Sequence, residues 1–266
     1  MKSSNPIGIF DSGIGGLTVL KEIRYHIPGE NLIYFGDTAR VPYGIKSAET
    51  VRRFSKEIAD YLVRLEVKML VVACNTATAA ALNTLRESLP IPVVGVLMPG
   101  AYAASRATKS GRVGVIGTES TVASGAYERL IRNIRPGTEI FAASCPLFVP
   151  LVEEGRLTGE ITALVAKEYL LPLKEKDIDT LVLGCTHYPL LKPVIGEVMG
   201  VKTMLIDSAH ETAQEVRRVL DKNGFENGPG GDGYIRYFVT DAPERFKAVG
   251  ERFLGYDIPE VEKAEL

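Results

Sequence analysis

The feature that most constrains the fold of this chain is a series of short apolar segments that alternate with longer stretches of helical pattern. Segments such as Met69–Ala73 and Thr180–Leu183 show no alternation of polar and apolar residues. Strands of this kind are typical of parallel sheets that helices cover on both faces. The sequence therefore predicts an α/β fold with mostly parallel sheets. Strands are expected at residues 6–10, 31–35, 69–73, 92–96, 113–116, 139–142, 180–183, 203–206 and 235–239.

The composition argues against several classes of protein. Among 266 residues, 31 Lys and Arg face 33 Asp and Glu, and no long run of like charge stands out, so we expect no nucleic-acid partner. The weakly polar stretch Ile91–Ala104 is interrupted by proline and glycine and is too short to cross a bilayer. The segment Met1–Phe10 lacks the pattern of a secretory signal. We therefore expect a cytoplasmic protein with no membrane partner.

The residues that follow the expected strands occur in a repeated arrangement. Asp11 and Cys74 end two strands of the first half and lie 63 residues apart, and Thr118 and Cys185 end two strands of the second half at a separation of 67. Ligands of parallel α/β sheets bind beyond the carboxyl ends of the strands. The sequence therefore predicts two pseudo-symmetric, three-layer α/β domains with the active site in a cleft between them.

Turn and cap residues suggest where the chain passes between these domains. Pro99-Gly100 is expected to form the turn into the second domain, and Ser208 is expected to cap the helix that returns to the first. We expect a surface loop at residues 223–233 and a solvated end after Tyr256. The predicted domains are residues 1–97 with 209–266, and residues 98–208.

The three cysteines differ in their sequence context. Cys74 and Cys185 each follow a strand and precede a helical pattern, which predicts a position at or near a helix N-terminus. Unpaired N–H groups and the helix dipole favour a thiolate there, so we expect their pKa to lie below the usual value of about 8.5. Cys145 precedes Pro146 without a polar companion and is expected to be a buried core residue. In a chain without an export signal all three should stay reduced.

Two thiols in matched contexts can serve several kinds of chemistry. Disulfide exchange prefers cysteines closer in sequence, and zinc would need further ligands. His187 and His210 could supply them, but the spacing is not that of a metal site, so we predict no metal for the cysteines. A thiolate on one face of a carbon and a thiol on the other can remove a proton and return one with inversion. The pair therefore favours inversion of a stereocentre.

Polar groups near the two thiols suit an amino-acid substrate. Backbone N–H groups around Ser12 and Gly13 could bind carboxylates. Asp11 could assist one thiol or be a plain helix cap, and His187 could assist the other or be a buried histidine with satisfied hydrogen bonds. Side-chain donors for the substrate are Asn75, Thr76, Thr118, Thr121 and Thr186.

The segment Gly13-x-Gly15-Gly16 resembles a dinucleotide fingerprint only in part. Thr18 occupies the position of its third glycine, so we predict no nicotinamide or flavin cofactor. We interpret the glycines as a tight turn that lets a substrate approach the backbone. Tyr43-Gly44, after Pro42, is an ordered turn whose tyrosine either lines a pocket or simply packs within the turn.

Taken together, these segments resemble the motif set of the bacterial glutamate racemases, in the aspartate/glutamate racemase family. The motifs run from residue 7 to Ser208 in the family's order. They are Phe10-Asp11-Ser12-Gly13-Ile14-Gly15-Gly16-Leu17, Tyr34-Phe35-Gly36-Asp37, Pro42-Tyr43-Gly44, Ala73-Cys74-Asn75-Thr76-Ala77 and Leu183-Gly184-Cys185-Thr186-His187-Tyr188-Pro189-Leu190.

This resemblance implies a racemase that interconverts L- and D-glutamate without a cofactor and supplies D-glutamate for peptidoglycan precursors. By position, Cys74 would deprotonate the D-isomer and Cys185 the L-isomer. Asp11 and His187 would assist the thiols, and Glu153 resembles a further acidic assistant near Cys185. Members of the family have two α/β domains and are often homodimers. The substrate-binding residues implied are Asp11, Ser12, Tyr43, Gly44, Asn75, Thr76, Thr186 and His187.

Two alternatives stay open. Aspartate racemases share the two-cysteine design but usually carry an acidic residue after the second Cys-Thr, where this chain has His187. One methylene changes binding by only about 1–3 kcal/mol, so activity on aspartate is conceivable. A non-catalytic amino-acid-binding protein of the same fold would need neither thiol.

Overall fold

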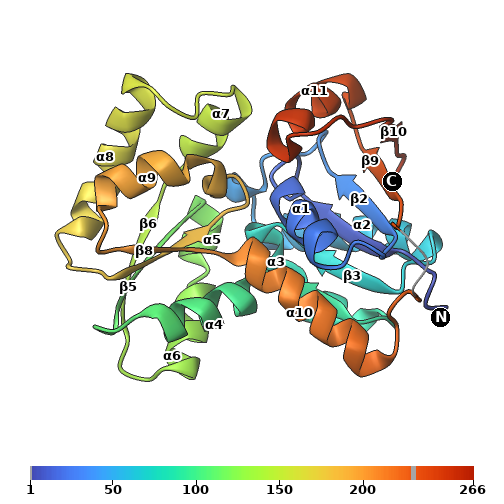
Figure 1. Ribbon diagram of the computed structural model, residues 1–266, viewed down its shortest axis with the longest axis horizontal. Helices are drawn as coiled ribbons and strands as arrows, with labels where there is room; N and C mark the ends of the chain where they lie inside the picture. Colours follow the sequence, from blue (N-terminus) through green and yellow to red (C-terminus); the bar gives the residue numbers. More distant parts are fainter. Residues whose placement is uncertain (1, 229–231) are drawn as a thin grey trace.

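A computed structural model describes residues 2–228 and 232–266, and its elements gather into two lobes (Figure 1). The first lobe contains both termini and is built from two separate parts of the chain. The second lobe is built from the middle of the chain. The first lobe contains β1 (Ile7–Asp11), α1 (Leu17–His26), β2 (Leu32–Gly36), α2 (Ala48–Arg64), β3 (Met69–Val72), α3 (Asn75–Ser88), β4 (Val93–Gly95), α10 (Ser208–Asn223), β9 (Ile235–Val239), α11 (Pro243–Leu254) and β10 (Glu262–Lys263).

The second lobe follows the same plan with fewer strands. Its strands are separated by one or two helices along the chain from residue 97 to residue 207. They are α4 (Leu97–Ala107), β5 (Arg112–Gly117), α5 (Glu119–Ala123), α6 (Ala126–Ile134), β6 (Glu139–Ser144), α7 (Phe148–Glu153), α8 (Glu160–Lys174), β7 (Thr180–Gly184), α9 (Lys192–Met199) and β8 (Met204–Asp207).

Within the described residues, the two sheets have matching strand orders and every pairing is parallel. The first sheet runs β10-β9-β2-β1-β3-β4 and the second runs β6-β5-β7-β8. In each, the first strand of the repeat lies between the second and the third, so β1 corresponds to β5 and β3 to β7. The carboxyl ends of β1 and β3 carry Asp11 and Cys74, and those of β5 and β7 carry Thr118 and Cys185. The α/β fold with parallel sheets is therefore confirmed.

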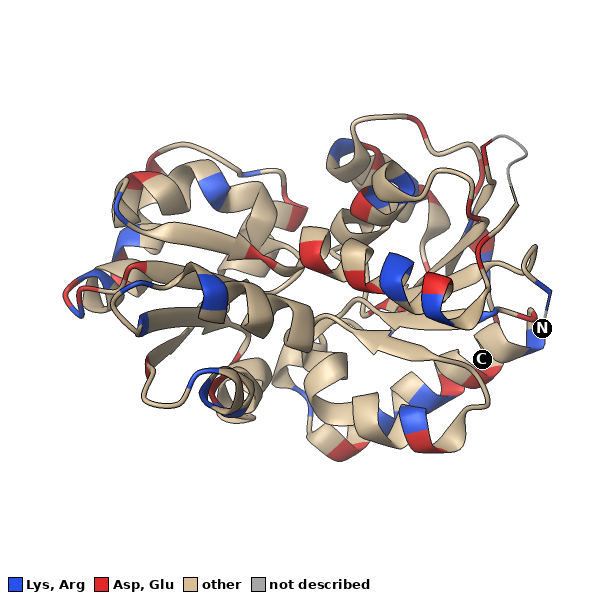
Figure 2. Ribbon diagram, turned by 60° about the horizontal axis from the view of Figure 1, so that its bottom comes forward, with Lys and Arg blue, Asp and Glu red and all other residues tan. Residues whose placement is uncertain are grey.

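Helices cover both faces of each sheet, as unbroken apolar strands require. In the first lobe α1 contacts α10 and α11, while α2 contacts α3. In the second lobe α4 packs against α6, and α8 packs against α9. One continuous core joins the lobes, because it contains Leu17 of α1, Leu170 of α8 and Ala213 of α10. Lys and Arg positions are interspersed with Asp and Glu positions along the helices (Figure 2). In the part of the chain that is described, no helix has both the length and the apolarity needed to cross a bilayer.

The two connections between the lobes differ from the sequence expectation in detail. Pro99 and Gly100 form no turn, because they lie inside α4, where Pro99 occupies the first helical turn and needs no N–H partner. The return helix α10 is capped by Asp207, whose carboxylate accepts the N–H of Ala209 at 2.9 Å, and Ser208 is its first residue. The domain limits at 97/98 and 208/209 stay a prediction.

The segment after Tyr256 is not a purely solvated end, as the sequence analysis expected. Glu262 and Lys263 form β10 beside β9, and Ile258 and Ala264 are buried. The charges of this segment are paired at the edge, where Glu262 contacts Arg236 at 2.9 Å. Of the loop expected at residues 223–233, residue 223 ends α10, residues 224–228 form neither helix nor strand, and residues 229–231 lie outside the described residues.

Candidate active site

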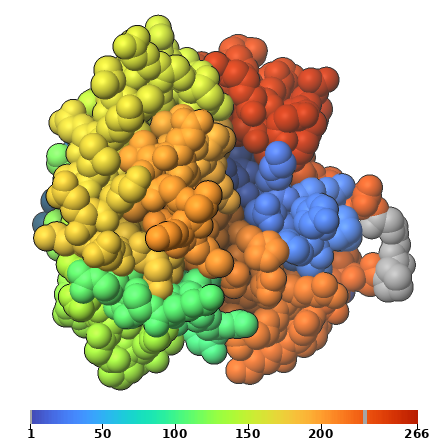
Figure 3. Space-filling model, turned by 60° about the vertical axis from the view of Figure 1, so that its left-hand side comes forward, coloured from blue at the N-terminus to red at the C-terminus, as the bar shows by residue number. Residues whose placement is uncertain are grey.

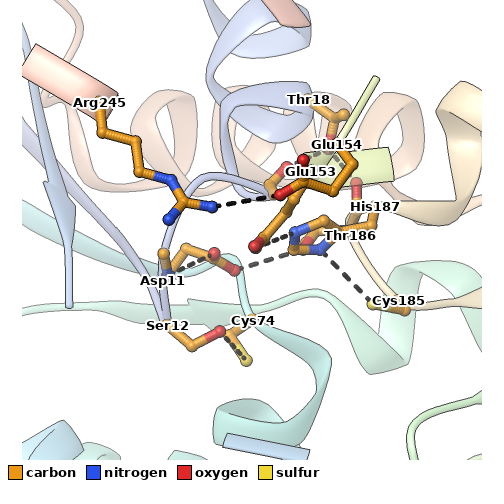
Figure 4. Close-up of polar contacts among 12 residues, drawn as sticks. Asp11, Ser12, Thr18, Cys74, Glu153, Glu154, Cys185, Thr186, His187 and Arg245 are labelled. Carbon is orange, nitrogen blue, oxygen red and sulfur yellow. Dashed lines mark hydrogen bonds and ion pairs between the residues drawn. The ribbon is translucent and has the colours of Figure 1, made fainter. Parts of the chain in front are cut away.

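A small cavity of about 30 Å³ lies between the carboxyl ends of the two sheets. Because parallel strands end on one edge, the residues after β1 and β3 face those after β5 and β7. Figure 4 shows Cys74 and Ser12 on one side, with Cys185 and His187 on the other. The cavity is lined by Ser12, Val41, Pro42, Tyr43, Gly44, Cys74, Asn75, Thr76, Thr118, Val149, Gly184, Cys185, Thr186 and His187.

Cys74 lies at the start of α3 in a buried setting. Its Sγ accepts the N–H of Ala77 at 3.4 Å as the N-cap of the helix, and lies 3.6 Å from the hydroxyl of Ser12. Burial and, to a smaller extent, the negative charge of Asp11 nevertheless raise the pKa of the Cys74 thiol to about 12, against the lowering effect of the hydrogen bonds from Ala77 and Ser12. The lowered pKa expected from the helix N-terminus is therefore wrong for this cysteine, which is a neutral thiol at neutral pH.

Cys185 has a different local structure and an ionisable neighbour. A short 3₁₀ turn, Tyr188–Leu191, follows it before α9 begins, so Cys185 lies near the start of a helical segment, as the sequence predicts, without capping an α-helix. Its Sγ lies 3.8 Å from Nδ1 of His187, and Nε2 of that ring lies 3.2 Å from Oε1 of Glu153. The sulfur, the imidazole and the carboxylate thus form a chain of contacts.

The charge state of His187 follows from this chain of contacts. Burial by itself lowers the pKa of a histidine, but the hydrogen bonds to Cys185 and Glu153 outweigh it and raise the pKa of His187 to about 10. Burial also acts to raise the pKa of Glu153, yet the His187 ring lowers it overall. With this raised pKa the ring carries a positive charge at neutral pH, and it lies beside the sulfur of Cys185.

Asp11 links the two lobes rather than contacting Cys74 directly. Its carboxylate accepts the N–H of Gly13 at 2.9 Å and the hydroxyl of Thr186 at 3.3 Å. Burial raises the pKa of Asp11, while the positive charge of His187 opposes that effect. The hydroxyl of Thr18 reaches the carbonyl of Thr186 at 3.2 Å and adds a second link.

The glycines after β1 allow the lobes to approach each other. A Cβ on Gly15 would lie 2.2 Å from Oγ1 of Thr186 and 2.5 Å from Nδ1 of His187, which no real side chain tolerates. Gly44 is crowded in the same way, because a Cβ there would lie 2.6 Å from Cβ of Thr118. The sequence predicts that the glycine turn after β1 lets a substrate approach the backbone. In the structure, Thr186 and His187 of the second lobe pack against this turn at Gly15.

Hydroxyl and amide groups complete the cavity wall. Thr76 of the first lobe forms a triangle with Thr118 and Thr121 of the second, with oxygen separations of 2.9, 3.1 and 3.0 Å. The amide of Asn75 donates to the hydroxyl of Tyr127 at 2.8 Å. The Oδ1 atom of Asn75 is buried and has no hydrogen-bond partner among the described residues. A buried acceptor of this kind is suited to a ligand donor at the cavity.

Tyr43 is held at the cavity by a buried carboxylate. Its hydroxyl donates to Oδ2 of Asp37 at 2.5 Å, and Arg40 contacts the same oxygen at 2.7 Å. Thr240 donates to the other oxygen at 2.9 Å. Asp37, the last residue of the strand-end motif Tyr34-Phe35-Gly36-Asp37, is therefore held by Arg40 and Thr240 and in turn fixes the hydroxyl of Tyr43.

The structure brings most of the expected site residues together. Asp11, Thr121 and Glu153 do not line the cavity, but each contacts a residue that does, namely Thr186, Thr76 and His187. Four lining residues were not predicted as site residues, namely Val41, Pro42, Val149 and Gly184, and neither was Tyr127 behind Asn75. Cys145 is fully buried, and its carbonyl accepts the hydroxyl of Tyr188 at 2.8 Å, as a core role predicts.

Known proteins resemble this chain over its whole length. A glutamate racemase of Geobacter metallireducens is 56% identical over 260 residues, which cover 98% of this chain and 96% of that one. The crystal structure of a Francisella tularensis glutamate racemase in complex with D-glutamate is 39% identical, with a TM-score of 0.93 over 99% of this chain and 98% of that one. A Thermus thermophilus glutamate racemase in complex with β-chloro-D-alanine is 49% identical, with a TM-score of 0.91 over 100% and 99%.

The family assignment rests on a match of most of the chain. The model of the family described as Asp/Glu/Hydantoin racemase matches residues 16–216, which span α1 to the middle of α10. The matched range contains both strand-end cysteines and the His187 segment. The chain belongs to the Asp/Glu/Hydantoin racemase family.

Proposed function

We propose that this protein interconverts L- and D-glutamate by a two-base mechanism in which Cys74 and Cys185 act on opposite faces of the α-carbon. The observation that carries the proposal is the placement of two thiols, one from each lobe, on the wall of one cavity. Similarity to glutamate racemases over nearly the full chain supports the reaction and the substrate. Inversion needs a proton acceptor on one face and a donor on the other, and the two sulfurs supply both.

The electrostatics of the cavity support one resting distribution of protons. The raised pKa of Cys74, about 12, keeps that residue as a thiol, while the positive charge of His187 lies beside the sulfur of Cys185. In the L-to-D direction the Cys185 thiolate takes the α-proton, and the Cys74 thiol gives its proton to the opposite face. The thiol and thiolate then exchange places, and the D-to-L direction runs the same steps in reverse.

Polar groups on the cavity wall would bind the substrate. We assign the carboxylates and the ammonium group to six residues of the cavity lining: Ser12, Tyr43, Gly44, Asn75, Thr76 and Thr186. The unpartnered Oδ1 of Asn75 supports a contact with the ammonium group. Thr118 and Thr121 hold Thr76 in place. Asp11, His187 and Glu153 assist the thiols through charge and position.

The test is to incubate the protein with L-glutamate in D₂O, without added cofactor, and to follow optical rotation together with deuterium at the α-carbon. We expect racemisation, with solvent deuterium in the inverted product. Activity on aspartate but not on glutamate would transfer the assignment to aspartate racemisation. Inactivity on both amino acids, combined with tight binding of either, would indicate a binding protein of this fold.

We further propose a cellular role that follows from the product. D-glutamate made in the cytoplasm would enter peptidoglycan precursors, and the enzyme would work as a homodimer with no nucleic-acid or membrane partner. Expression in a bacterium that requires external D-glutamate tests the role, because growth without the supplement is expected. Sedimentation of the purified protein tests the dimer, and a monomer at working concentration would overturn it.

A further inference from the structure

A second group of potential ligands lies outside the active site, where α1 meets α10. The chain has three histidines, and two of them, His26 and His210, lie together here with Glu22. Glu22 and His26 are one turn apart on α1, and His210 comes from the first turn of α10. Figure 3 shows α1 in blue beside α10 in orange on the molecular surface. The mechanism proposed above uses none of these residues.

The potential ligand atoms of the three side chains lie within 4.8 Å of one another. Nε2 of His26 lies 3.1 Å from Nδ1 of His210 and 3.5 Å from Oε2 of Glu22, and the last two atoms are 3.3 Å apart. Ligands about 2.0–2.1 Å from a tetrahedral zinc ion are separated by about 3.3 Å. The separations of the three atoms are therefore close to those along one face of a zinc tetrahedron.

A neighbouring amide can fix the protonation of one ring. The side-chain nitrogen of Gln214, one turn along α10, lies 2.9 Å from Nε2 of His210. With the amide turned by 180°, its oxygen would accept the Nε2 proton and leave the lone pair of Nδ1 directed at His26 and Glu22. Metal-binding histidines commonly have such a partner on the second nitrogen.

The site is also accessible. The side chain of His26 is about one-fifth exposed and that of His210 about half exposed. His26 and Gln214 line a cleft of about 870 Å³ that extends between α4 and α10. A water molecule can reach the open side, and His₂Glu with one water is a known zinc ligand set. We propose that Glu22, His26 and His210 form a zinc site that ties α1 to the start of α10.

A zinc ion bound at this site would connect α1 and α10, two helices that are far apart in sequence, near the point where the chain returns from the second lobe. α1 follows the strand that carries Asp11, and α10 follows β8 where the chain returns from the second lobe. An ion held by both helices would favour the folded arrangement, since the unfolded chain does not preassemble the ligands. The thermal midpoint should therefore rise with zinc concentration.

The test is equilibrium dialysis of metal-stripped protein against ZnCl₂, with four proteins in parallel: wild type, His210→Gln, Glu211→Gln and the double variant Cys74→Ala with Cys185→Ala. We expect about one zinc per chain in wild type, in Glu211→Gln and in the cysteine variant. His210→Gln should bind at least about tenfold more weakly, since it loses a direct ligand. Circular dichroism shows whether each variant is folded.

The variants separate this site from other sources of zinc binding. Unchanged zinc binding by His210→Gln would overturn the proposal. Loss of zinc binding in the cysteine variant would also overturn it and would assign the metal to the thiols. Equal loss in His210→Gln and Glu211→Gln would indicate surface charge alone and would also overturn it. Co²⁺ gives an independent readout, because tetrahedral absorption bands without thiolate charge transfer are expected. A double cysteine variant that fails to fold leaves the cobalt spectrum of the wild type to decide.

Discussion

The two thiols occupy corresponding positions in the two lobes but have unlike surroundings. Each follows the third strand of its repeat, β3 or β7, and each is about 6–7% exposed. Cys74 caps an α-helix and contacts the hydroxyl of Ser12, whereas Cys185 precedes a 3₁₀ turn and contacts His187. The helix N-terminus does not lower the pKa of Cys74, because the cost of burying a charge exceeds the gain from one N–H group and the dipole. The two sulfurs therefore differ in the side chain that each one contacts, which is Ser12 for Cys74 and the charged His187 for Cys185.

The largest expected effect comes from removing either sulfur. Cys74→Ser and Cys185→Ser should each lower kcat for racemisation by about 10³-fold or more, since a hydroxyl keeps the size but its pKa is far outside the useful range. The measurement is the optical rotation of L- and D-glutamate with each variant. Turnover near the wild-type rate in either variant would disprove the two-thiol mechanism.

The same variants distinguish the two faces. With a glutamate analogue that carries a leaving group at the β-carbon, one base is enough for elimination. Cys74→Ser should still eliminate from the L-isomer and Cys185→Ser from the D-isomer. Equal losses for both isomers in each variant would contradict the assignment of one thiol to each face.

The second prediction concerns His187→Asn, which removes the charge beside Cys185. We expect kcat to fall by about 10²-fold, with most of the loss in the L-to-D direction, where Cys185 is the base. Asn keeps hydrogen-bonding groups near Glu153 but carries no charge. The measurement is kcat and KM for both directions in wild type and variant. Because the equilibrium constant is unchanged, kcat/KM falls equally for L- and D-glutamate, and the discriminating quantity is kcat. Equal losses of kcat in the two directions would point to a merely structural role.

The pH dependence of stability tests the charge of His187 separately. Its pKa is raised from 6.5 to about 10 in the folded state, so the folded protein binds this proton more tightly than the unfolded chain does. The resulting stabilisation is complete below pH of about 6.5 and is lost as the pH rises through about 10. Urea unfolding of wild type and His187→Asn should therefore differ most at low pH and converge above about pH 10.

The substitution Gly15→Ala tests the close approach of the lobes. Gly15→Ala would place a Cβ 2.2 Å from Thr186, so we expect the lobes to shift, kcat/KM to fall about tenfold and stability to fall by about 1–3 kcal/mol. Gly196→Ala is the matched control, because a Cβ there would lie 4.0 Å from Leu205 and alanine favours the helix α9. Equal behaviour of the two variants would show that Gly15 is not needed for the contact.

The strands could be predicted because each is a short, unbroken apolar segment, as is typical of strands in a covered parallel sheet. The position of the candidate site could be predicted because parallel strands have their carboxyl ends at one edge of a sheet. The sequence did not predict β10, since Glu262 and Lys263 are charged and their pairing with β9 depends on residues far away in the chain. It also missed Tyr127, which meets Asn75 across 52 positions of sequence. The protonation of Cys74 was wrong for the same reason, because burial is a property of the assembled lobes and not of a motif.

The smallest expected effect comes from the cysteine that lacks a counterpart. Cys145 is as buried as the other two, and burial raises its pKa as well, but no acid or base contacts its sulfur among the described residues. Cys145→Ala should leave kcat within about twofold and destabilise the fold by roughly 1 kcal/mol, the cost of losing a small buried group. Racemisation assays and urea unfolding measure the two effects. A large loss of activity with little loss of stability would show that burial near Cys185 is enough to involve a thiol in the reaction. The contrast between Cys145 and the two cysteines of the cavity would then fail.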